Sequence, residues 1–399
     1  MTDTTTITPS DAQTFQRCAY IVPRKNRSCK MIVKNGLTYC GEHAVFDESN
    51  IHRIPCPINP KHTADKRHLE DHLKKCCARV PEDPWVIQNI NKKDIPDEEE
   101  KYEDLTKEIT KVSKIVEDEY EKIKPEILIE YEEAEIVEND LKKENIGKTK
   151  HLKQISSIIG HLMKNKLLEN DKSKAVFELG VGKGQLAFYM ASQAPETKFV
   201  LVDYSGIKHK VDNKVKNKNA VDIKRIRCPI EHVDASKISS LISSSFVSAV
   251  CKHFCGSATD YGINCIINAI SNNVAINGFC LAPCCHHRIS ISQYIGHDYL
   301  KSIKIDAPQL ISSLRMIASW ATCGPPIKET AFIQADDNGE SFKFWSYEKK
   351  LILGRKAKAI IEFGRVLYLR KVCGFDCRLL EYIDVNVSPE NLMIVGVKK

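Results

Sequence analysis

From about Lys148 onward, two kinds of hydrophobic pattern alternate along the chain. Short, continuous apolar runs such as residues 175–179 (AVFEL) and 198–204 (KFVLVDY) are separated by longer runs with apolar residues at helical spacing. A continuous apolar run of this length is typical of a strand covered on both faces. Strands that alternate with helices predict βαβ units and a mostly parallel sheet. We therefore expect an α/β domain of the Rossmann-like class over residues 148–399.

Residues 84–147 have a different pattern, with many charges and almost no glycine. Between Asp97 and Glu144 there are 19 acidic and 8 basic side chains, and Pro96 and Pro125 interrupt the stretch. Apolar residues still recur there at helical spacing, at Leu105, Ile109, Val112, Ile115 and Val116. We interpret the stretch as an acidic, solvated helical linker, with a short coiled coil as the alternative.

Residues before about Pro81 are rich in Cys, His and Pro and too few to hold a sizeable apolar core. The N-terminus lacks the basic start and apolar core of a secretory signal, and no segment reaches the roughly 18 consecutive apolar residues of a membrane span. We therefore expect an intracellular protein of the nucleus or cytoplasm, neither secreted nor membrane-bound. The 16 cysteines of such a protein stay reduced, which favours zinc binding.

Two groups of cysteine and histidine have the composition of closed, four-ligand zinc sites. The first is Cys18, Cys29, Cys40 and His43, which predicts a CCCH-type finger over residues 15–46. The short hook from Cys40 to His43 is typical of such sites, although the two ten-residue gaps between the cysteines are unusual. Free cysteines in a disordered arm are the alternative.

The second group predicts a CHHC-type finger over residues 53–80, and its members are Cys56, His62, His72 and Cys76. His72 and Cys76 lie four residues apart, so on a helix they face the same way. His68 is an alternative ligand, but His62 is preferred because it leaves the two leucines of the helix facing a miniature core. Both shells are closed, so we expect two structural Zn²⁺ ions without a catalytic role.

Charge is divided unevenly along the chain. The formal net charge is +7, but the acidic stretch alone carries −11, so the remainder carries +18. Such an excess suits a polyanionic partner, because each phosphate contact releases condensed counterions. Basic residues surround the first zinc group: Arg24, Lys25, Arg27, Lys30 and Lys34. A merely soluble basic surface is the alternative.

Residues 175–190 (AVFELGVGKGQLAFYM) predict a strand, a glycine-rich turn and a helix. The turn has the pattern E-x-G-x-G-x-G, formed by Glu178, Gly180, Gly182 and Gly184. A dinucleotide-binding fingerprint would need a glycine where this chain has Gln185. The pattern is instead that of the loop that wraps the methionine portion of S-adenosylmethionine, although glycine-rich turns also serve plain strand–helix packing.

Polar residues follow the ends of the next predicted strands, where ligands bind in open α/β sheets. Asp203 comes roughly 20 residues after the glycines and is placed to accept hydrogen bonds from ribose hydroxyls. Asp234 follows the third strand, where it either reaches the adenine or caps a helix. Lys252 and His253 end the strand after that.

A further strand ends in the run Cys284 to Arg288, which contains two cysteines and two histidines. Successive strand residues point to opposite faces, so four in a row do not easily enclose one tetrahedral ion, and we do not expect a third metal site there. A helix (AKAIIEFGRVLYLRKV) then precedes two strands joined by Ser388-Pro389-Glu390, which we expect to close the sheet as a hairpin.

Together these motifs resemble a known family, the eukaryotic tRNA 2′-O-methyltransferases that modify nucleotide 4 of the acceptor stem. The resemblance rests on the two fingers and on ELGVGKG, CKHFCGSATD, PCCHHR and FGRVLYLR…SPEN, and it runs from about residue 15 to the C-terminus except for the acidic linker. Two positions depart from the family: Ile289, where a cysteine is expected, and Phe254, where leucine is usual.

The resemblance implies methyl transfer from S-adenosylmethionine to a ribose 2′-hydroxyl of tRNA, with no obligate protein partner evident. A general base adds roughly 10²–10⁴-fold to such a reaction, and Lys252 and His253 are the candidates. Asp260, His286 and Arg288 are candidates to orient ribose or phosphate. The alternative is a non-catalytic RNA-binding protein, because the second finger also resembles one in a minor-spliceosome protein. Base methylation is a third candidate, but the chain lacks an Asn-Pro-Pro-Tyr-type loop.

Overall fold

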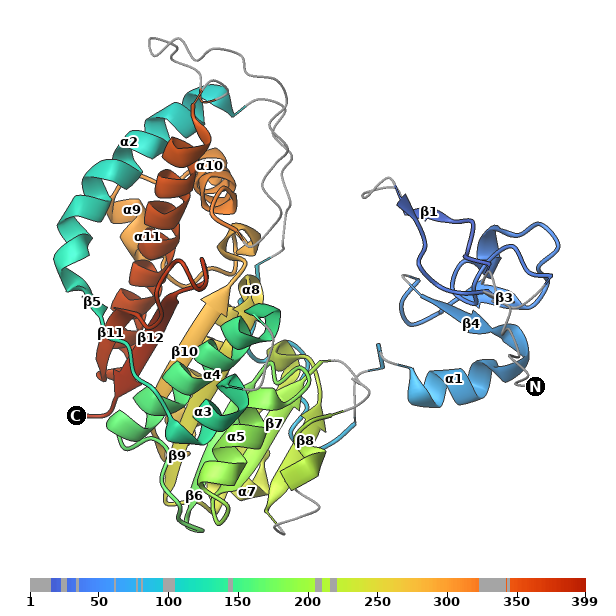
Figure 1. Ribbon diagram of the computed structural model, residues 1–399, viewed down its shortest axis with the longest axis horizontal. Coiled ribbons are helices and arrows are strands. Elements are labelled where there is room, and N and C mark those ends of the chain that lie inside the picture. The colour runs from blue at the N-terminus through green and yellow to red at the C-terminus, as the bar shows by residue number, and fades with distance from the viewer. Residues whose placement is uncertain are drawn as a thin grey trace, which may run out of the picture. The chain divides into compact units, whose positions relative to one another are not determined.

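A computed structural model describes residues 16–22, 27–33, 36–60, 62–76, 78–79, 82–95, 105–142, 146–204, 210–215, 221–322, 342 and 345–399. The chain divides into two units, Met1–Val80 and Pro81–Lys399 (Figure 1). None of the described helices is long and apolar enough to cross a membrane.

The N-terminal unit consists of turns and very short elements. Its strands pair as two hairpins, β1 (Ile21–Val22) with β2 (Arg27–Ser28) and β3 (Arg53–Pro55) with β4 (Thr63–Asp65). Its helices are η2 (Ala44–Phe46), η3 (Lys66–His68) and α1 (Leu69–Lys75). The buried apolar cluster of its described residues contains three cysteines and one valine, Cys18, Cys29, Cys40 and Val33. Apolar burial by itself therefore contributes little to holding this unit together.

An eight-stranded mixed sheet forms the centre of the C-terminal unit, in the order β5-β11-β12-β10-β9-β6-β7-β8. The strands are β5 (Ile127–Ile129), β6 (Lys174–Leu179), β7 (Lys198–Asp203), β8 (Ile223–Arg227), β9 (Phe246–Cys255), β10 (Ile276–Cys284), β11 (Asp376–Glu381) and β12 (Leu392–Val397). Neighbours from β8 to β10 are parallel, as predicted. β11 and β12 form the predicted antiparallel hairpin, and β12 closes against β10.

The order of the strands places a ligand-binding crevice. The chain runs outward from β6 to β7 and β8 and then returns to β9 on the other side of β6. At such a switch point the loops after neighbouring parallel strands leave in opposite directions, so their carboxyl ends border a crevice. The predicted cofactor loop follows β6, and Lys252 and His253 lie near the end of β9.

Helices cover both faces of the sheet (Figure 1). One apolar cluster joins the sheet to α2 (Thr106–Ile123), α8 (Ser257–Ser271), α9 (His297–Ser302), α10 (Pro308–Ser319) and α11 (Tyr347–Cys373). The other joins it to α3 (Glu135–Leu141), α4 (Ile146–Lys164) and α5 (Gln185–Gln193). Because helices cover both faces of the sheet, the central strands are apolar along their whole length: in β6 and β7 every residue after the first is buried.

The acidic stretch is not solvated as we expected. Ile109, Val112 and Val116 of α2 are fully buried in the core, and α2 packs against α10 and α11. The same stretch supplies β5, which pairs parallel with β11 at the edge of the sheet. Helical spacing indicated an apolar stripe, but it could not indicate which surface covers the stripe. The charged residues of α2 are partly or fully exposed except Glu119, which is buried and accepts a hydrogen bond from the Tyr299 hydroxyl. The helix is therefore an integral part of the C-terminal unit.

Candidate functional site

The four predicted ligands of the first finger converge in the structure. The ligand atoms of Cys18, Cys29, Cys40 and His43 all lie within 4.8 Å of one another. Nδ1 of His43 is 3.4 Å from Sγ of Cys18 and 3.3 Å from Sγ of Cys40. The ring of Tyr20 stacks on the imidazole with centroids 3.9 Å apart, which fixes the ring orientation. Three sulfurs and one nitrogen at these spacings fit a tetrahedral Zn²⁺ shell.

The second finger brings together Cys56, His62, His72 and Cys76 in the same way, again within 4.8 Å. The two sulfurs are 3.6 Å apart, and the two Nε2 atoms are 3.3 Å apart. His68, the alternative ligand, is exposed and lies outside the group. Thr63 of the second finger donates hydrogen bonds to the Glu42 carboxylate of the first finger, from its backbone N–H at 2.9 Å and from its hydroxyl at 3.1 Å, and these bonds link the two fingers.

The glycine-rich loop after β6 is shaped by its three predicted glycines, all at positive φ. A Cβ at Gly180 would lie 2.6 Å from the Phe254 ring, and one at Gly184 would collide with the Asp212 carboxylate. A Cβ at Gly182 would meet no described atom within 4 Å. Gly180 and Gly184 are therefore required by the close packing of neighbouring side chains, whereas Gly182, between them, borders open space in which a ligand can approach the backbone.

Asp203, at the end of β7, is tied to this loop. Its Oδ2 accepts a hydrogen bond from the backbone N–H of Gly182 at 2.7 Å. Arg225 supports the loop from β8, because its guanidinium donates to the Gly182 carbonyl at 3.2 Å and to Oδ1 of Asp212 at 3.0 Å. Arg225 and Asp212 could not be identified from the sequence, because Arg225 reaches the loop only through the pairing of β8 with β7.

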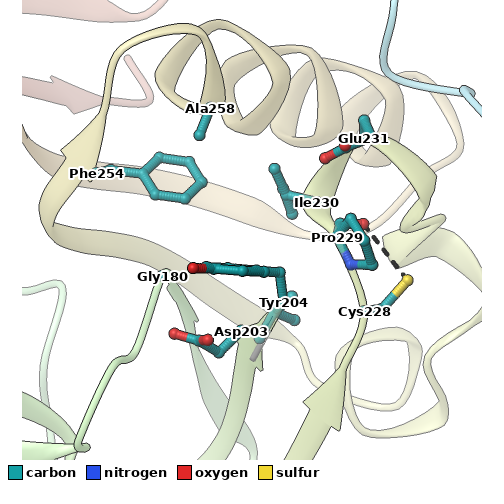
Figure 2. A pocket seen from close by; sticks show the side chains of 10 residues that line it. Gly180, Asp203, Tyr204, Cys228, Pro229, Ile230, Glu231, Phe254 and Ala258 are labelled. Carbon is teal, nitrogen blue, oxygen red and sulfur yellow. Dashed lines mark hydrogen bonds between the residues drawn. The ribbon is translucent and has the colours of Figure 1, made fainter. Parts of the chain in front are cut away.

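A pocket of about 200 Å³ opens beside Asp203. Its lining comes from the ends of β6, β7, β8 and β9 and the start of α8: Gly180, Val202, Asp203, Tyr204, Cys228, Pro229, Ile230, Glu231, Phe254 and Ala258. Figure 2 shows Phe254 and Ile230 on one side of the Tyr204 ring and the Asp203 carboxylate on the other. Such a lining suits a flat, largely apolar ring that is linked to a group with hydroxyls, because the carboxylate of Asp203 can accept hydrogen bonds from hydroxyls.

Asp234 does not line this pocket. Its carboxylate accepts hydrogen bonds from the backbone N–H of Ser236 at 3.0 Å and from the Ser236 hydroxyl at 2.6 Å. It therefore caps the short helix η6 (Ala235–Lys237), which was the alternative to contacting the adenine. The residues that follow β8 in the pocket are instead Cys228 to Glu231.

Glu178 is buried directly before the loop, on β6. Its Oε2 has no hydrogen-bond partner among the described residues, and burial raises the pKa of its carboxyl to about 8. A buried carboxylate without a partner is unstable in its charged form. A positively charged ligand group at this point would supply the missing partner and favour the ionised carboxylate.

Lys252 and His253 differ in their environments. Burial lowers the pKa of Lys252 to about 8, although the nearby Glu178 acts in the opposite direction. Burial, together with the positive charge of Lys252, lowers the pKa of His253 to about 3. His253 also adopts φ 59°, and its Nε2 lies 3.0 Å from Oε1 of Gln154 on α4. Lys252 therefore exchanges a proton near neutral pH, whereas His253 stays neutral and positioned by Gln154.

Asp260 and His286 do not lie where a substrate could touch them, contrary to our expectation. Asp260 is fully buried, and its Oδ2 is 2.7 Å from Nη2 of Arg365. His286 is also buried, with Nε2 3.0 Å from Oε1 of Glu362 and Nδ1 3.6 Å from Oε2 of Glu390. The buried carboxylate of Asp260 is stabilised by its pairing with the Arg365 guanidinium. Both residues belong to an internal ionic network, completed by the Arg365–Glu362 pair, that positions α8 and η7 (His286–Arg288) against α11.

Arg288 is exposed at the end of η7, and its carbonyl accepts a hydrogen bond from the Ser257 hydroxyl at 3.2 Å. Next to Arg288 the structure gathers three sulfurs that sequence reasoning did not connect, those of Cys255, Cys284 and Cys285. Cys255 lies on β9 and the other two lie at the end of β10, so only the strand pairing brings them together.

Comparisons with known proteins identify related chains. Residues 153–397 match the family model described as Methyltransferase TRM13. Residues 16–44 match the model of the CCCH zinc finger in TRM13 protein, and residues 53–76 match that of the U11-48K-like CHHC zinc finger. These two models confirm zinc as the metal predicted for both groups.

Full-length relatives are similar over nearly the whole chain. The tRNA:m(4)X modification enzyme TRM13 homolog of Homo sapiens is 30% identical over 466 residues, covering 96% of this chain and 94% of that one. The Kluyveromyces lactis tRNA:m(4)X modification enzyme TRM13 is 26% identical, covering 98% and 97%. The solved plantazolicin methyltransferase BpumL in complex with SAH is 9% identical and covers 73% of this chain and 97% of its own, at a TM-score of 0.30.

Proposed function

The chain belongs to the TRM13 methyltransferase family, as the resemblance of its motifs indicated, and from this membership we propose its reaction and substrate. It transfers a methyl group from S-adenosylmethionine to the ribose 2′-hydroxyl of nucleotide 4 in the acceptor stem of tRNA. The observation that carries the proposal is the pocket at the switch point, where the glycine-rich loop, Asp203 and the Lys252 strand meet. Position 4 of tRNA follows from the names of the relatives.

The pocket residues suit the parts of S-adenosylmethionine. Asp203 is placed to accept hydrogen bonds from the ribose hydroxyls, and the Tyr204, Ile230 and Phe254 side chains suit the adenine. Oε2 of Glu178, which has no hydrogen-bond partner among the described residues, suits the positively charged groups of the methionine portion. When bound, the cofactor supplies an electrophilic methyl group. This part of the proposal assigns Asp234 no cofactor contact, because its carboxylate caps η6.

We assign the role of general base to Lys252. A base works best when its pKa lies near the working pH, and the pKa of Lys252 is about 8, whereas that of His253 is about 3. Unprotonated Nζ of Lys252 accepts the proton that leaves the ribose hydroxyl as the oxygen attacks. His253 acts as a positioning residue, since its ring is tied to Gln154. Arg288 contacts a phosphate of the acceptor stem.

The N-terminal unit serves RNA recognition in this proposal. Arg27 and Lys30 beside the first finger are exposed, whereas Arg24, Lys25 and Lys34 lie outside the described residues. The fingers over residues 15–46 and 53–80 form the recognition part, and the catalytic domain of residues 148–399 works together with α2 and β5 of the preceding acidic stretch. A tRNA substrate also makes the nucleus or cytoplasm the place of action.

The experiment that tests the function maps the labelled methyl group on tRNA after incubation with labelled cofactor. We expect label on the 2′-oxygen of nucleotide 4. A label on a base, or cofactor binding without any transfer to tRNA, would overturn the proposal.

A matched pair of glycine variants tests the cofactor loop. Gly182 and Gly374 both have positive φ, and a Cβ at either meets no described atom within 4 Å. Gly182→Asp and Gly374→Asp should therefore have a similar backbone cost, because each places a residue with a Cβ in the left-handed region that favours glycine. Only Gly182 borders the loop tied to Asp203. We expect calorimetry to show loss of cofactor binding in Gly182→Asp and unchanged affinity in Gly374→Asp; equal affinities would exclude this loop.

A further inference from the structure

Three thiols form a cluster at the carboxyl ends of β9 and β10, outside the two fingers. Sγ of Cys255 is 3.0 Å from Sγ of Cys284 and 3.5 Å from Sγ of Cys285, and the last two sulfurs are 3.7 Å apart. All three sulfurs lie within 4.8 Å of one another. The cluster is not sealed in the core, because Cys255 is exposed and Cys285 is partly exposed.

The two fingers provide an internal measure of what these distances mean. In the second finger, the distances between pairs of ligand atoms range from 3.2 Å (His72 Nε2 to Cys56 Sγ) to 3.6 Å (Cys56 Sγ to Cys76 Sγ). In the first finger, the ligand distances to Nδ1 of His43 are 3.3 and 3.4 Å. A Zn–S bond of about 2.3 Å with tetrahedral angles places two sulfurs about 3.8 Å apart. Two of the three sulfur–sulfur distances in the cluster, 3.5 and 3.7 Å, are close to this spacing. The third, between Cys255 and Cys284, is shorter at 3.0 Å, so binding of an ion must move these two sulfurs apart.

The backbone around the cluster is shaped to bring the thiols together. Cys285 adopts φ 53°, a left-handed conformation that costs a residue with a Cβ free energy. Gly256, which follows Cys255, has φ 55°, and a Cβ there would lie 2.6 Å from the Arg288 carbonyl oxygen. Its N–H donates to the Cys284 carbonyl at 3.0 Å. Unfavourable local geometry of this kind is usually retained where it serves a function.

The run of Cys284 to His287 does not enclose an ion by itself, as the alternation of side chains predicts. His286 instead points into the internal ionic network with Glu362 and Glu390. The strand pairing supplies the missing ligand from elsewhere, because Cys255 is the register partner of Cys284. Two neighbouring cysteines and one from the next strand can therefore surround one side of a single ion.

We propose that Cys255, Cys284 and Cys285 bind a third Zn²⁺ ion, with one coordination position open to water or to a substrate oxygen. Three sulfur donors select a soft or borderline ion such as zinc. Binding of Zn²⁺ to three thiols releases three protons and leaves a shell with a net charge of −1. No fourth His, Cys, Asp or Glu atom of the described residues joins the group, so the shell resembles an open zinc site with three protein ligands rather than a closed one.

The proposed ion lies between two turns that border the crevice. It ties the turn after Lys252 and His253 to the turn that carries Arg288. These are the residues assigned to the reacting hydroxyl and to phosphate, so the ion holds the substrate side of the crevice in one geometry. The inference concerns metal binding by this chain and does not depend on which nucleotide is methylated.

The test is the zinc content of the full-length protein, purified with a thiol reductant and measured by mass spectrometry of the metal. We expect three zinc ions per chain in the unmodified protein and two in Cys255→Ser. Cys56→Ala, which removes a ligand of the second finger, should also contain two, and the double variant should contain one. Cys373→Ser is the matched control: Cys373 is partly exposed on α11 and outside every ligand group, so this variant should retain three ions.

A second variant covers weak residual binding. If Cys255→Ser keeps an ion, Cys255→Ser/Cys285→Ser leaves a single thiol and must lose it, with circular dichroism unchanged. The proposal is overturned if the unmodified protein holds two zinc ions and Cys255→Ser also holds two. It is likewise overturned if the protein purified with reductant contains a Cys255–Cys284 disulfide by peptide mapping, because those sulfurs are then not available as ligands.

Discussion

The two units of this chain are stabilised in different ways. The described part of the N-terminal unit buries a small cluster of cysteines and one valine, whereas the C-terminal unit packs a sheet between two large apolar clusters. A structural zinc contributes about 10–16 kcal/mol of apparent binding free energy, and one buried apolar side chain contributes about 1.5–3 kcal/mol. Stability is therefore concentrated in eight ligands in the first unit and distributed over many side chains in the second. The proposed methyl transfer takes place in the C-terminal unit, where a single substitution in the core removes only a small part of the total stabilising free energy.

The largest expected effect comes from removing one finger ligand. Cys56→Ala should unfold the second finger, because loss of the ion removes about 10–16 kcal/mol of binding free energy that the small core cannot replace. Affinity for tRNA should fall, and the slope of log affinity against log salt should become shallower. Cofactor affinity by calorimetry and the melting of the C-terminal unit should be unchanged. Loss of cofactor binding in this variant would show that the two units are not independent.

The next largest effect concerns the proposed base. Lys252→Ala should reduce the single-turnover rate by roughly 10²–10⁴-fold, since the ribose hydroxyl loses its proton acceptor. Binding of tRNA and of cofactor should persist, which is the reverse of the finger variant. Lys301→Ala, an exposed lysine on α9, is the control and should keep the full rate. Normal turnover in Lys252→Ala would exclude Lys252 as the general base.

Core variants test the distributed stability of the C-terminal unit. Ile158 on α4 is fully buried, and Ile158→Ala should reduce the free energy of unfolding by about 2–5 kcal/mol. Met163 on the same helix is 41% exposed, so Met163→Ala should stay within about 0.5 kcal/mol of the unmodified protein. Denaturant unfolding of the C-terminal unit measures both. The zinc bound by the two fingers should not change, and a loss of finger zinc in Ile158→Ala would contradict the separation of the units.

The smallest effect is the pH dependence of the rate. Lys252 must be unprotonated to accept a proton, so the rate should rise with pH through its pKa of about 8 and then level off. Between pH 7 and pH 9 the unprotonated fraction, and hence the single-turnover rate, should increase about tenfold. The pKa of His253, about 3, lies far below this range and contributes no step. A rate that falls over the same interval would exclude Lys252 as the base.

Features that depend on neighbours in the chain were predictable. The hook from Cys40 to His43, the pair His72 and Cys76 one turn apart, and the glycines after β6 are each set within a few residues. Their geometry follows from local backbone rules, so spacing along the chain is enough to predict the ligand groups. The apolar strands and the closing hairpin were predictable for the same reason, because the burial pattern of each strand follows from the apolar and polar residues of that strand.

Features that depend on which elements meet were decided by the tertiary structure. The sequence showed an apolar stripe on α2 but not its burial against α10 and α11, and it placed Asp260 and His286 near the crevice without revealing their partners Arg365 and Glu362. The alternation of side chains argued against a metal site within the run Cys284 to Arg288, and only the strand pairing places Cys255 beside Cys284 and Cys285. Residues far apart in the chain come together only when strand order and packing are fixed, since side-chain contact depends on the whole core rather than on local spacing.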